Sequence, residues 1–144
     1  MAGPSNRAFI GVMSSLHKLA YGMTGGIIGG QFGKAPILLL RTTGRKSGRE
    51  RTTPLLYYRD GDNMVVIASN GGADYHPGWY VNLKANPNAK VQVGRATATV
   101  TGETASAEDR ARLWPLITEM YSDYAEYEKR TKRQIPVVIL RHSG

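Results

Sequence analysis

The chain has 144 residues, which suffice for one domain with a buried core and are too few for two ordinary domains. It contains no cysteine, which excludes a disulfide scaffold, a thiolate nucleophile and cysteine-ligated zinc. The formal net charge of +8 favours an anionic partner, such as nucleic acid, an acidic membrane surface or a phosphorylated cofactor.

The first 33 residues have a pattern of their own. Apolar residues at helical spacing predict a short amphipathic helix over 6–21, and the repeated glycines of 22–30 predict a flexible connector. No apolar stretch here is long enough for a membrane span or typical of a secretory signal. We therefore divide the chain into an N-terminal helix with its connector (1–33) and a main domain (34–144). We expect a cytoplasmic protein whose N-terminal helix packs on the main domain or touches the inner face of the membrane peripherally.

The main domain is rich in strand patterns. Five segments alternate or cluster apolar and β-branched residues as antiparallel strands do: 37–43, 51–59, 63–69, 89–93 and 96–103. The Asp60-Gly61 pair and Gly94 predict the tight turns of two hairpins. The unbroken apolar run over 136–140 predicts a sixth strand, buried on both faces.

Helices are predicted between and after these strands. Residues 76–86 form a short helix, with Pro77 suited to its first turn, and 106–121 form a longer one that Ser106 caps. A further helical stretch covers 123–131. Hairpins with few intervening helices predict a mainly β fold of about six strands, an antiparallel barrel with flanking helices.

The segment 41–54 carries the densest positive charge. Gly44 and Gly48 let backbone amides turn toward an anion. Donors for phosphate or carboxylate oxygens are offered by Arg45, Lys46, Arg49 and Arg51 and by the pair Thr52-Thr53. A small phosphorylated ligand, a nucleic acid and a merely solvated hairpin tip are all compatible with this pattern.

Two further segments have candidate binding groups. In 69–82, paired glycines allow close backbone approach, and Trp79, Tyr80 and Asn82 suit a heterocycle, although the aromatic residues could equally anchor the core. Tyr121, Tyr124 and Tyr127 share one face if they lie in a continuous helix, either for packing or for a polar task. The residues that could ligate a metal, His17, His76 and His142, lack metal-site spacing, so we predict no metal site.

Taken together, the turn at 44–48 with 51–54, the segment 71–87 and the tyrosines of 121–127 resemble the deazaflavin-dependent nitroreductase family. The resemblance covers about residues 34–141. It implies a split β-barrel, similar to FMN-binding split barrels, that uses reduced coenzyme F-420. This coenzyme is an 8-hydroxy-5-deazaflavin with a phospholactate and oligoglutamate tail.

The resemblance also implies roles for individual residues. It assigns the anionic tail to Arg45, Lys46 and Arg51. Further cofactor contacts, mostly with the ring, are expected from Thr53, Pro54, Leu56, Ile67, Ser69, Asn70, Gly78, Trp79 and Asn82. Tyr121, Tyr124 and Tyr127 would line the acceptor side, and Tyr124 is the first candidate for the proton donor. Relatives have a lysine where this chain has Asn70, and often a proline where it has Asp74.

The implied enzyme is a reductase of the nitroreductase or quinone reductase type. It passes a hydride from reduced coenzyme F-420 to a quinone, a nitroaromatic compound or an activated enone, as a monomer or a homodimer. The alternatives are an FMN-dependent oxidoreductase on the same barrel and a non-enzymatic protein that binds a deazaflavin or nucleic acid.

Overall fold

The computed structural model describes residues 31–32 and 35–143. The predicted N-terminal helix and most of the predicted connector lie outside the described residues, and so does the proposed membrane contact of that helix. The boundary between 33 and 34 therefore stays a prediction. Within the described ranges, no helix has the length and apolar character that crossing a membrane requires.

Strands are the most abundant elements in the described part of the chain, and three α-helices flank them. The strands are β1 (Gln31–Phe32), β2 (Ala35–Thr43), β3 (Glu50–Leu56), β4 (Tyr58–Asp60), β5 (Asn63–Ile67), β6 (Asn88–Val93), β7 (Ala96–Thr104) and β8 (Val137–His142). The helices are α2 (Gly78–Ala85), α3 (Ala107–Met120) and α4 (Asp123–Arg130), together with the single 3₁₀ turn η1 (Asn70–Gly72). Within the described residues, the predicted helices and strands are present, with ends that shift by a few residues.

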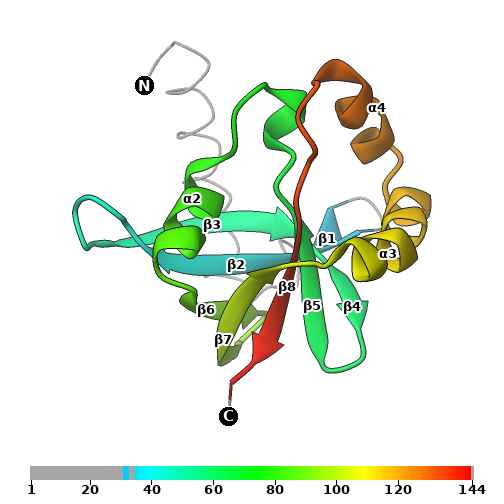
Figure 1. The fold of residues 1–144 in the computed structure, drawn as a ribbon. Coiled ribbons are helices and arrows are strands. Elements are labelled where there is room, and N and C mark those ends of the chain that lie inside the picture. Colours follow the sequence, from blue (N-terminus) through cyan, green and yellow to red (C-terminus); the bar gives the residue numbers. More distant parts are fainter. Residues whose placement is uncertain (1–30, 33–34, 144) are drawn as a thin grey trace.

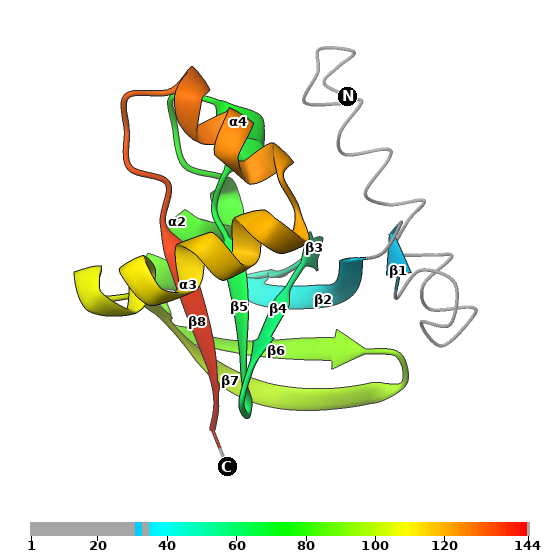
Figure 2. The ribbon, with the colours of Figure 1, turned by 90° about the vertical axis from the view of Figure 1, so that its right-hand side faces the viewer.

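The strands make one curled antiparallel sheet in the order β1-β2-β6-β7-β8-β5-β4, and β3, which lies off this path, also pairs with β2. Figure 1 shows the β2–β3 hairpin extending to one side, with α2 beside it and α4 at the top. In Figure 2, α3 lies across the sheet in front of β5 and β8. The predicted mainly β split barrel with flanking helices is confirmed.

The described strands number eight rather than about six, for two reasons. Gln31–Phe32 adds a two-residue strand against β2. The predicted strand over 51–59 is interrupted at Tyr57, whose backbone N–H donates to the Pro36 carbonyl at 3.1 Å. At this residue the chain leaves β2 and begins to pair with β5. The pattern of side chains shows a single extended segment and does not reveal this change of partner.

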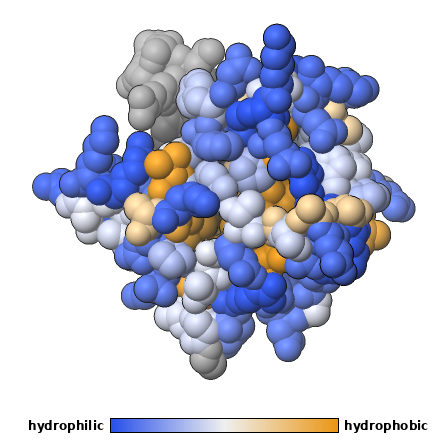
Figure 3. Space-filling view, in the orientation of Figure 1, coloured by the Kyte–Doolittle hydropathy of each residue, from blue (hydrophilic) through white to orange (hydrophobic). Residues whose placement is uncertain are grey.

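Two hydrophobic clusters lie on opposite faces of the central strands. Val138 and Leu140 point into the first cluster, inside the curl of the sheet, where α2 contributes Trp79 and Leu83. Val137 and Ile139 point into the second cluster, which α3 and α4 cover. The predicted burial of this strand on both faces is therefore confirmed. On the face shown in Figure 3, hydrophilic residues cover most of the surface and hydrophobic ones form small patches between them.

Helix α3 begins as predicted. The hydroxyl oxygen of Ser106 accepts from the backbone N–H of Asp109 at 3.1 Å, and Glu108 and Asp109 lie in the positive first turn. Leu113 and Ile117, one turn apart, are both buried against the sheet.

Truncation of Leu113 tests how strongly α3 is held. Leu113 is 0% exposed, whereas Leu116 in the same helix is 40% exposed. We expect Leu113→Ala to lower the free energy of unfolding by about 2–5 kcal/mol, because apolar contacts are lost and a cavity remains. Leu116→Ala should cost less than about 1 kcal/mol. Chemical denaturation measures both variants, and similar small losses would contradict the packing of α3 on the sheet.

Candidate functional site

One groove of about 1110 Å³ lies between the β2–β3 hairpin, the 3₁₀ turn η1, α2 and the tyrosines around α4. Every residue predicted to contact the cofactor or the acceptor lines it: Arg45, Lys46, Arg51, Thr53, Pro54, Leu56, Ile67, Ser69, Asn70, Gly78, Trp79, Asn82, Tyr121, Tyr124 and Tyr127. The structure thus brings together three segments that are far apart in the sequence. Their roles toward a ligand remain predictions.

The basic bend, residues 44–51 between β2 and β3, is a closed turn. Gly44 N–H donates to the Arg49 carbonyl at 2.7 Å, and Gly48 N–H donates to the Gly44 carbonyl at 2.8 Å. Gly48 has a φ of +71°, a left-handed conformation that glycine adopts without strain. These bonds fix the backbone, so the long basic side chains project from a defined base.

The cations of the basic bend that line the groove lack carboxylate partners. Among the described residues, Arg45, Lys46 and Arg51 form no salt bridge. The chain that precedes Glu50 has no aspartate or glutamate that could pair with them. The carboxylate oxygen Oε1 of Glu50 lies 3.9 Å from Nε of Arg41. Their positive charge is therefore available to an anion that enters the groove.

Asn82 connects the basic bend to α2. Its carboxamide oxygen accepts from the backbone N–H of Arg45 at 3.1 Å and from the Arg45 guanidinium Nη1 at 2.9 Å. Its Nδ2 donates to the hydroxyl of Thr42 at 3.4 Å, and both Asn82 and Thr42 are buried. The side chain predicted to face the ring thus also orients an arginine predicted to bind the tail. Sequence spacing gave no sign of this contact, because the partners are 37 positions apart.

The two aromatic residues at the start of α2 differ in position. Trp79 belongs to the first hydrophobic cluster and also lines the groove, so both interpretations of this residue apply. Tyr80 is buried in the same cluster, and its hydroxyl bonds with that of Thr104 at 2.7 Å. Tyr80 does not line the groove.

The turn after β5 contains Asn70 and Asp74, the two residues expected to differ from relatives. Asn70 has a φ of +48°, a left-handed conformation that asparagine tolerates better than most residues. Its Nδ2 donates to the Tyr75 carbonyl at 3.1 Å. Asp74 accepts from the hydroxyl of Thr131 at 2.9 Å. Asn70 therefore stabilises the turn itself, and Asp74 ties the turn to the end of α4.

The three tyrosines do not share one continuous helix. Tyr121 is the extended residue that ends α3, and Tyr124 and Tyr127 lie in α4. The rings still form one row: the centroids of Tyr121 and Tyr124 are 4.9 Å apart, and those of Tyr124 and Tyr127 are 6.2 Å apart, with edge-to-face geometry. The expected common face is thus produced by packing across a helix break.

Burial favours the protonated form of the Tyr124 and Tyr121 hydroxyl groups still further than in water. Tyr124 is only 6% exposed, and burial raises its pKa far above the ordinary value, with the neighbouring Tyr121 and Tyr127 adding to the shift. Burial, followed by the contact with Asp123, raises the pKa of Tyr121 to about 12. Both groups can therefore donate hydrogen bonds at neutral pH, where neither titrates.

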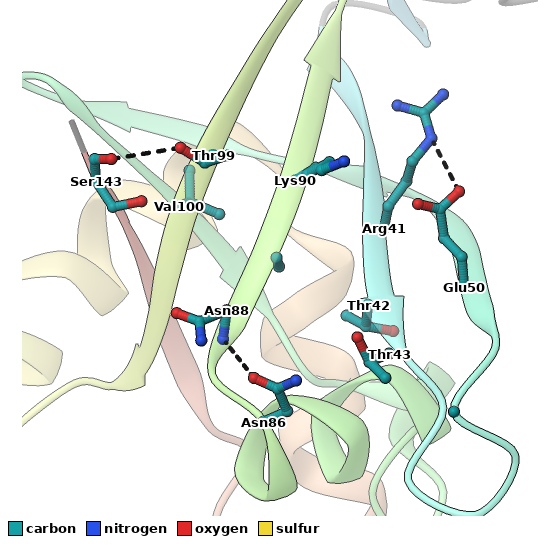
Figure 4. Close-up of a pocket in the computed structure, with 12 residues that line it drawn as sticks. Arg41, Thr42, Thr43, Glu50, Asn86, Asn88, Lys90, Thr99, Val100 and Ser143 are labelled. Carbon is teal, nitrogen blue, oxygen red and sulfur yellow. Dashed lines mark hydrogen bonds and ion pairs between the residues drawn. The ribbon is translucent and has the colours of Figure 1, made fainter.

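A second, smaller pocket of about 440 Å³ opens between β2, β6 and β7 (Figure 4). Several of its polar groups already have partners. Arg41 donates to Gln92 at 2.7 Å and lies 3.9 Å from Glu50. The Thr99 hydroxyl donates to the Ser143 carbonyl at 3.3 Å. None of the residues that the resemblance assigns to the cofactor or the acceptor lines this pocket, so the groove is the better candidate site.

Sequence reasoning missed part of the groove and part of its support. Ser47, Glu50, Leu55 and Pro77 also line it, all next to residues that were predicted. Arg133 was not predicted either, although it contacts the turn after β5 through several hydrogen bonds. In the sequence it is one of several basic residues in an ordinary polar connection, so no local pattern distinguishes it.

Comparison with known proteins gives consistent matches. Residues 14–142 match the family described as F420H(2)-dependent quinone reductase. A curated relative of that description from Mycobacterium tuberculosis is 46% identical over 129 residues, which cover 87% of this chain and 87% of the relative.

Two solved structures are similar in both sequence and fold. One, described as an F420-H2 dependent reductase, has a TM-score of 0.68 and 42% identity, covering 74% of this chain and 94% of that chain. The other, described as a domain-swapped dimer, has a TM-score of 0.71 and 36% identity, covering 88% and 96% of the two chains.

Removal of the Asn82 side chain tests the link between α2 and the basic bend. In Asn82→Ala the amide of Arg45 loses its acceptor, so we expect its hydrogen exchange to accelerate by about tenfold or more, equivalent to about 1–3 kcal/mol. Asn86→Ala, at the end of the same helix, is the matched control and should leave this amide unchanged. Unaltered exchange at Arg45 in Asn82→Ala would contradict the proposed link.

Proposed function

Because this chain belongs to the F420H(2)-dependent quinone reductase family, we propose that the groove is its site for coenzyme F-420 and for an electrophilic acceptor. The chain is an oxidoreductase, and coenzyme F-420 is its cofactor. Its acceptors are quinones and, we propose, nitroaromatic compounds and activated enones. All three classes have an electron-poor centre conjugated to an oxygen that takes up negative charge.

The observation that carries this proposal is the set of unpaired cations beside an aromatic and apolar wall. A deazaflavin with an acidic tail needs both surfaces in one site. Arg45, Lys46 and Arg51 supply the cations of the groove, and Trp79 adds an aromatic ring to the same lining. The volume of about 1110 Å³ exceeds the roughly 300–1,000 Å³ of ordinary small-molecule pockets, as an extended two-part ligand requires.

We assign the tail and the ring to different residues. Arg45 and Arg51 would donate charge-assisted hydrogen bonds to phosphate and carboxylate oxygens, with Asn82 holding Arg45 in place. Pro54, Leu56 and Ile67 would contact the ring and exclude water from it. When bound in reduced form, the coenzyme supplies a hydride.

The tyrosine row would serve the acceptor. A hydroxyl that stays protonated at neutral pH can donate to an oxygen on which negative charge develops. Tyr124, at the centre of the row, is fixed by both neighbouring rings and by the second hydrophobic cluster. We therefore assign the donor role to Tyr124, with Tyr121 and Tyr127 shaping the space around the acceptor.

A homodimer is the assembly that we propose. Support comes from the solved relative described as a domain-swapped dimer, which shares 36% identity with this chain.

Substitution of Arg51 tests the tail site. Arg51→Ala removes one charge-assisted contact, so we expect the dissociation constant for coenzyme F-420 to rise by about 5- to 150-fold, equivalent to about 1–3 kcal/mol. Arg95→Ala, in the exposed β6–β7 turn, is the matched control and should bind as the parent does. Calorimetric titration with coenzyme F-420 and with FMN measures these affinities. Tighter binding of FMN, or equal constants for Arg51→Ala and the parent, would contradict the proposed site.

Removal of the Tyr124 hydroxyl tests the acceptor side. Tyr124→Phe keeps the buried ring and loses the donor, so kcat with menadione should fall by about tenfold or more. The dissociation constant for the coenzyme should stay within about twofold of the parent, because the contact with the acceptor is the one lost. Tyr58→Phe, outside the groove, provides the control. Unchanged kcat in Tyr124→Phe would remove this hydroxyl from the mechanism.

A further inference from the structure

Arg133, in the connection between α4 and β8, binds the turn after β5 through its whole guanidinium group. Nε donates to the Ala73 carbonyl at 2.8 Å, and Nη2 donates to the Ser69 carbonyl at 2.8 Å. Both terminal nitrogens also lie 3.3 Å from the Ala68 carbonyl. A planar fork of donors is suited to several carbonyls at once, in a way that a lysine ammonium is not.

His76 completes this arrangement and must be neutral in it. Its Nδ1 lies 3.0 Å from Nη1 of Arg133. Arginine is only a donor, so Nδ1 must be the acceptor, and the proton of the neutral ring is then on Nε2. The Tyr80 ring packs against the same imidazole, with the centroids 4.8 Å apart and an interplanar angle of 60°.

The charges around His76 also favour its neutral form. Burial lowers its pKa below the ordinary value, and the positive charges of Arg133 and of Lys84 in α2 lower it further. The nearest acid in the same turn, Asp74, interacts electrostatically with Arg133 and is hydrogen-bonded to Thr131.

The turn held by Arg133 is a wall of the groove and also contacts α4. Ser69, Asn70 and Gly71 line the groove. The next residue, Gly72, has a φ of +85°, and a Cβ there would lie 3.1 Å from the Tyr127 carbonyl and the Arg130 side chain. Backbone and helix are therefore in close contact, and the position of this wall is linked to the helix that carries Tyr124 and Tyr127.

We propose that Arg133 is a positioning residue for the coenzyme site, that neutral His76 is its fourth acceptor, and that protonation of His76 loosens the Ser69–Gly71 wall. This inference rests on the proposed function of the groove. Neither side chain lines the groove, so both act through the backbone of residues 68–76.

The direction of the pH effect follows from the chemistry of the pair. A protonated imidazole has a donor on each nitrogen and repels the guanidinium beside it. The stabilising contact is complete above the ordinary histidine pKa, and it is lost as the pH falls through the lower pKa of His76 in the folded protein. Coenzyme affinity should therefore decline on acidification.

Calorimetric titration with coenzyme F-420 tests this inference. At about pH 7.5, we expect Arg133→Gln to raise the dissociation constant about tenfold and Arg133→Lys to give a smaller rise, because a lysine keeps the charge and loses the fork. His76→Asn keeps an acceptor near the position of Nδ1 and cannot titrate. At about pH 7.5, its dissociation constant should lie within about twofold of the parent's. Between about pH 7.5 and about pH 5.5, both constants can change, but the factor by which the parent's constant rises should be at least about three times the factor for His76→Asn.

The controls separate this effect from general damage. Arg59→Gln and His142→Asn alter exposed side chains outside the groove and should match the parent at both pH values. Any ionisation of the coenzyme affects the parent and His76→Asn alike, so the difference between their pH profiles belongs to the protein. Circular dichroism checks folding, and if Arg133→Gln does not fold, the comparison of His76→Asn with the parent decides.

Three results would overturn the inference. If the parent binds coenzyme F-420 and Arg133→Gln binds it equally well, Arg133 does not position the site, while the proposed function stands. If the parent and His76→Asn lose affinity in parallel on acidification, His76 is not the titrating group. If the parent does not bind the coenzyme at all, the proposed function and this inference fail together.

Discussion

The hydrogen bonds between the buried carboxamide of Asn82 and Arg45 are the contact on which the arrangement of the site depends. A hairpin that extends from a sheet is held only at its base, and its long basic side chains cost conformational entropy to order. Asn82 reduces that cost, because its oxygen binds both the backbone N–H and the guanidinium of Arg45. The helix that contributes the aromatic wall therefore also fixes the position of the positive charge. An anionic tail and a planar ring can then be bound at a set separation.

The two hydrophobic clusters explain why such a groove is stable. The curl of the sheet and α2 enclose the first cluster, and α3 and α4 cover the second on the opposite face of β5 and β8. Trp79 belongs to the first cluster and Tyr124 to the second, so the groove lies where the two meet the surface. Side chains that would contact the ring and the acceptor are thus held by core packing. The net charge of +8 is useful here because part of it lies unpaired beside this groove.

Much of the fold could be predicted from the sequence because local signals agreed with tertiary packing. Ser106 capped a helix as expected, and 136–140 was buried on both faces as its apolar run indicated. The residues of the candidate site could be named because a resemblance joined three separated motifs. The break at Tyr57 could not be predicted, since it reflects a change of strand partner. Nor could the contacts of Asn82 and Arg133, whose partners are 37 or more positions away in the sequence.

The most direct test of this account compares the binding of intact coenzyme F-420 with that of the same deazaflavin lacking its phospholactate and glutamate tail. If the basic bend binds the tail, the parent should bind the intact coenzyme at least about tenfold more tightly at low salt, and the advantage should shrink as salt screens the cations. Equal affinities for the two compounds at low salt would contradict the central claim, because the cations beside the groove would then contribute nothing to recognition.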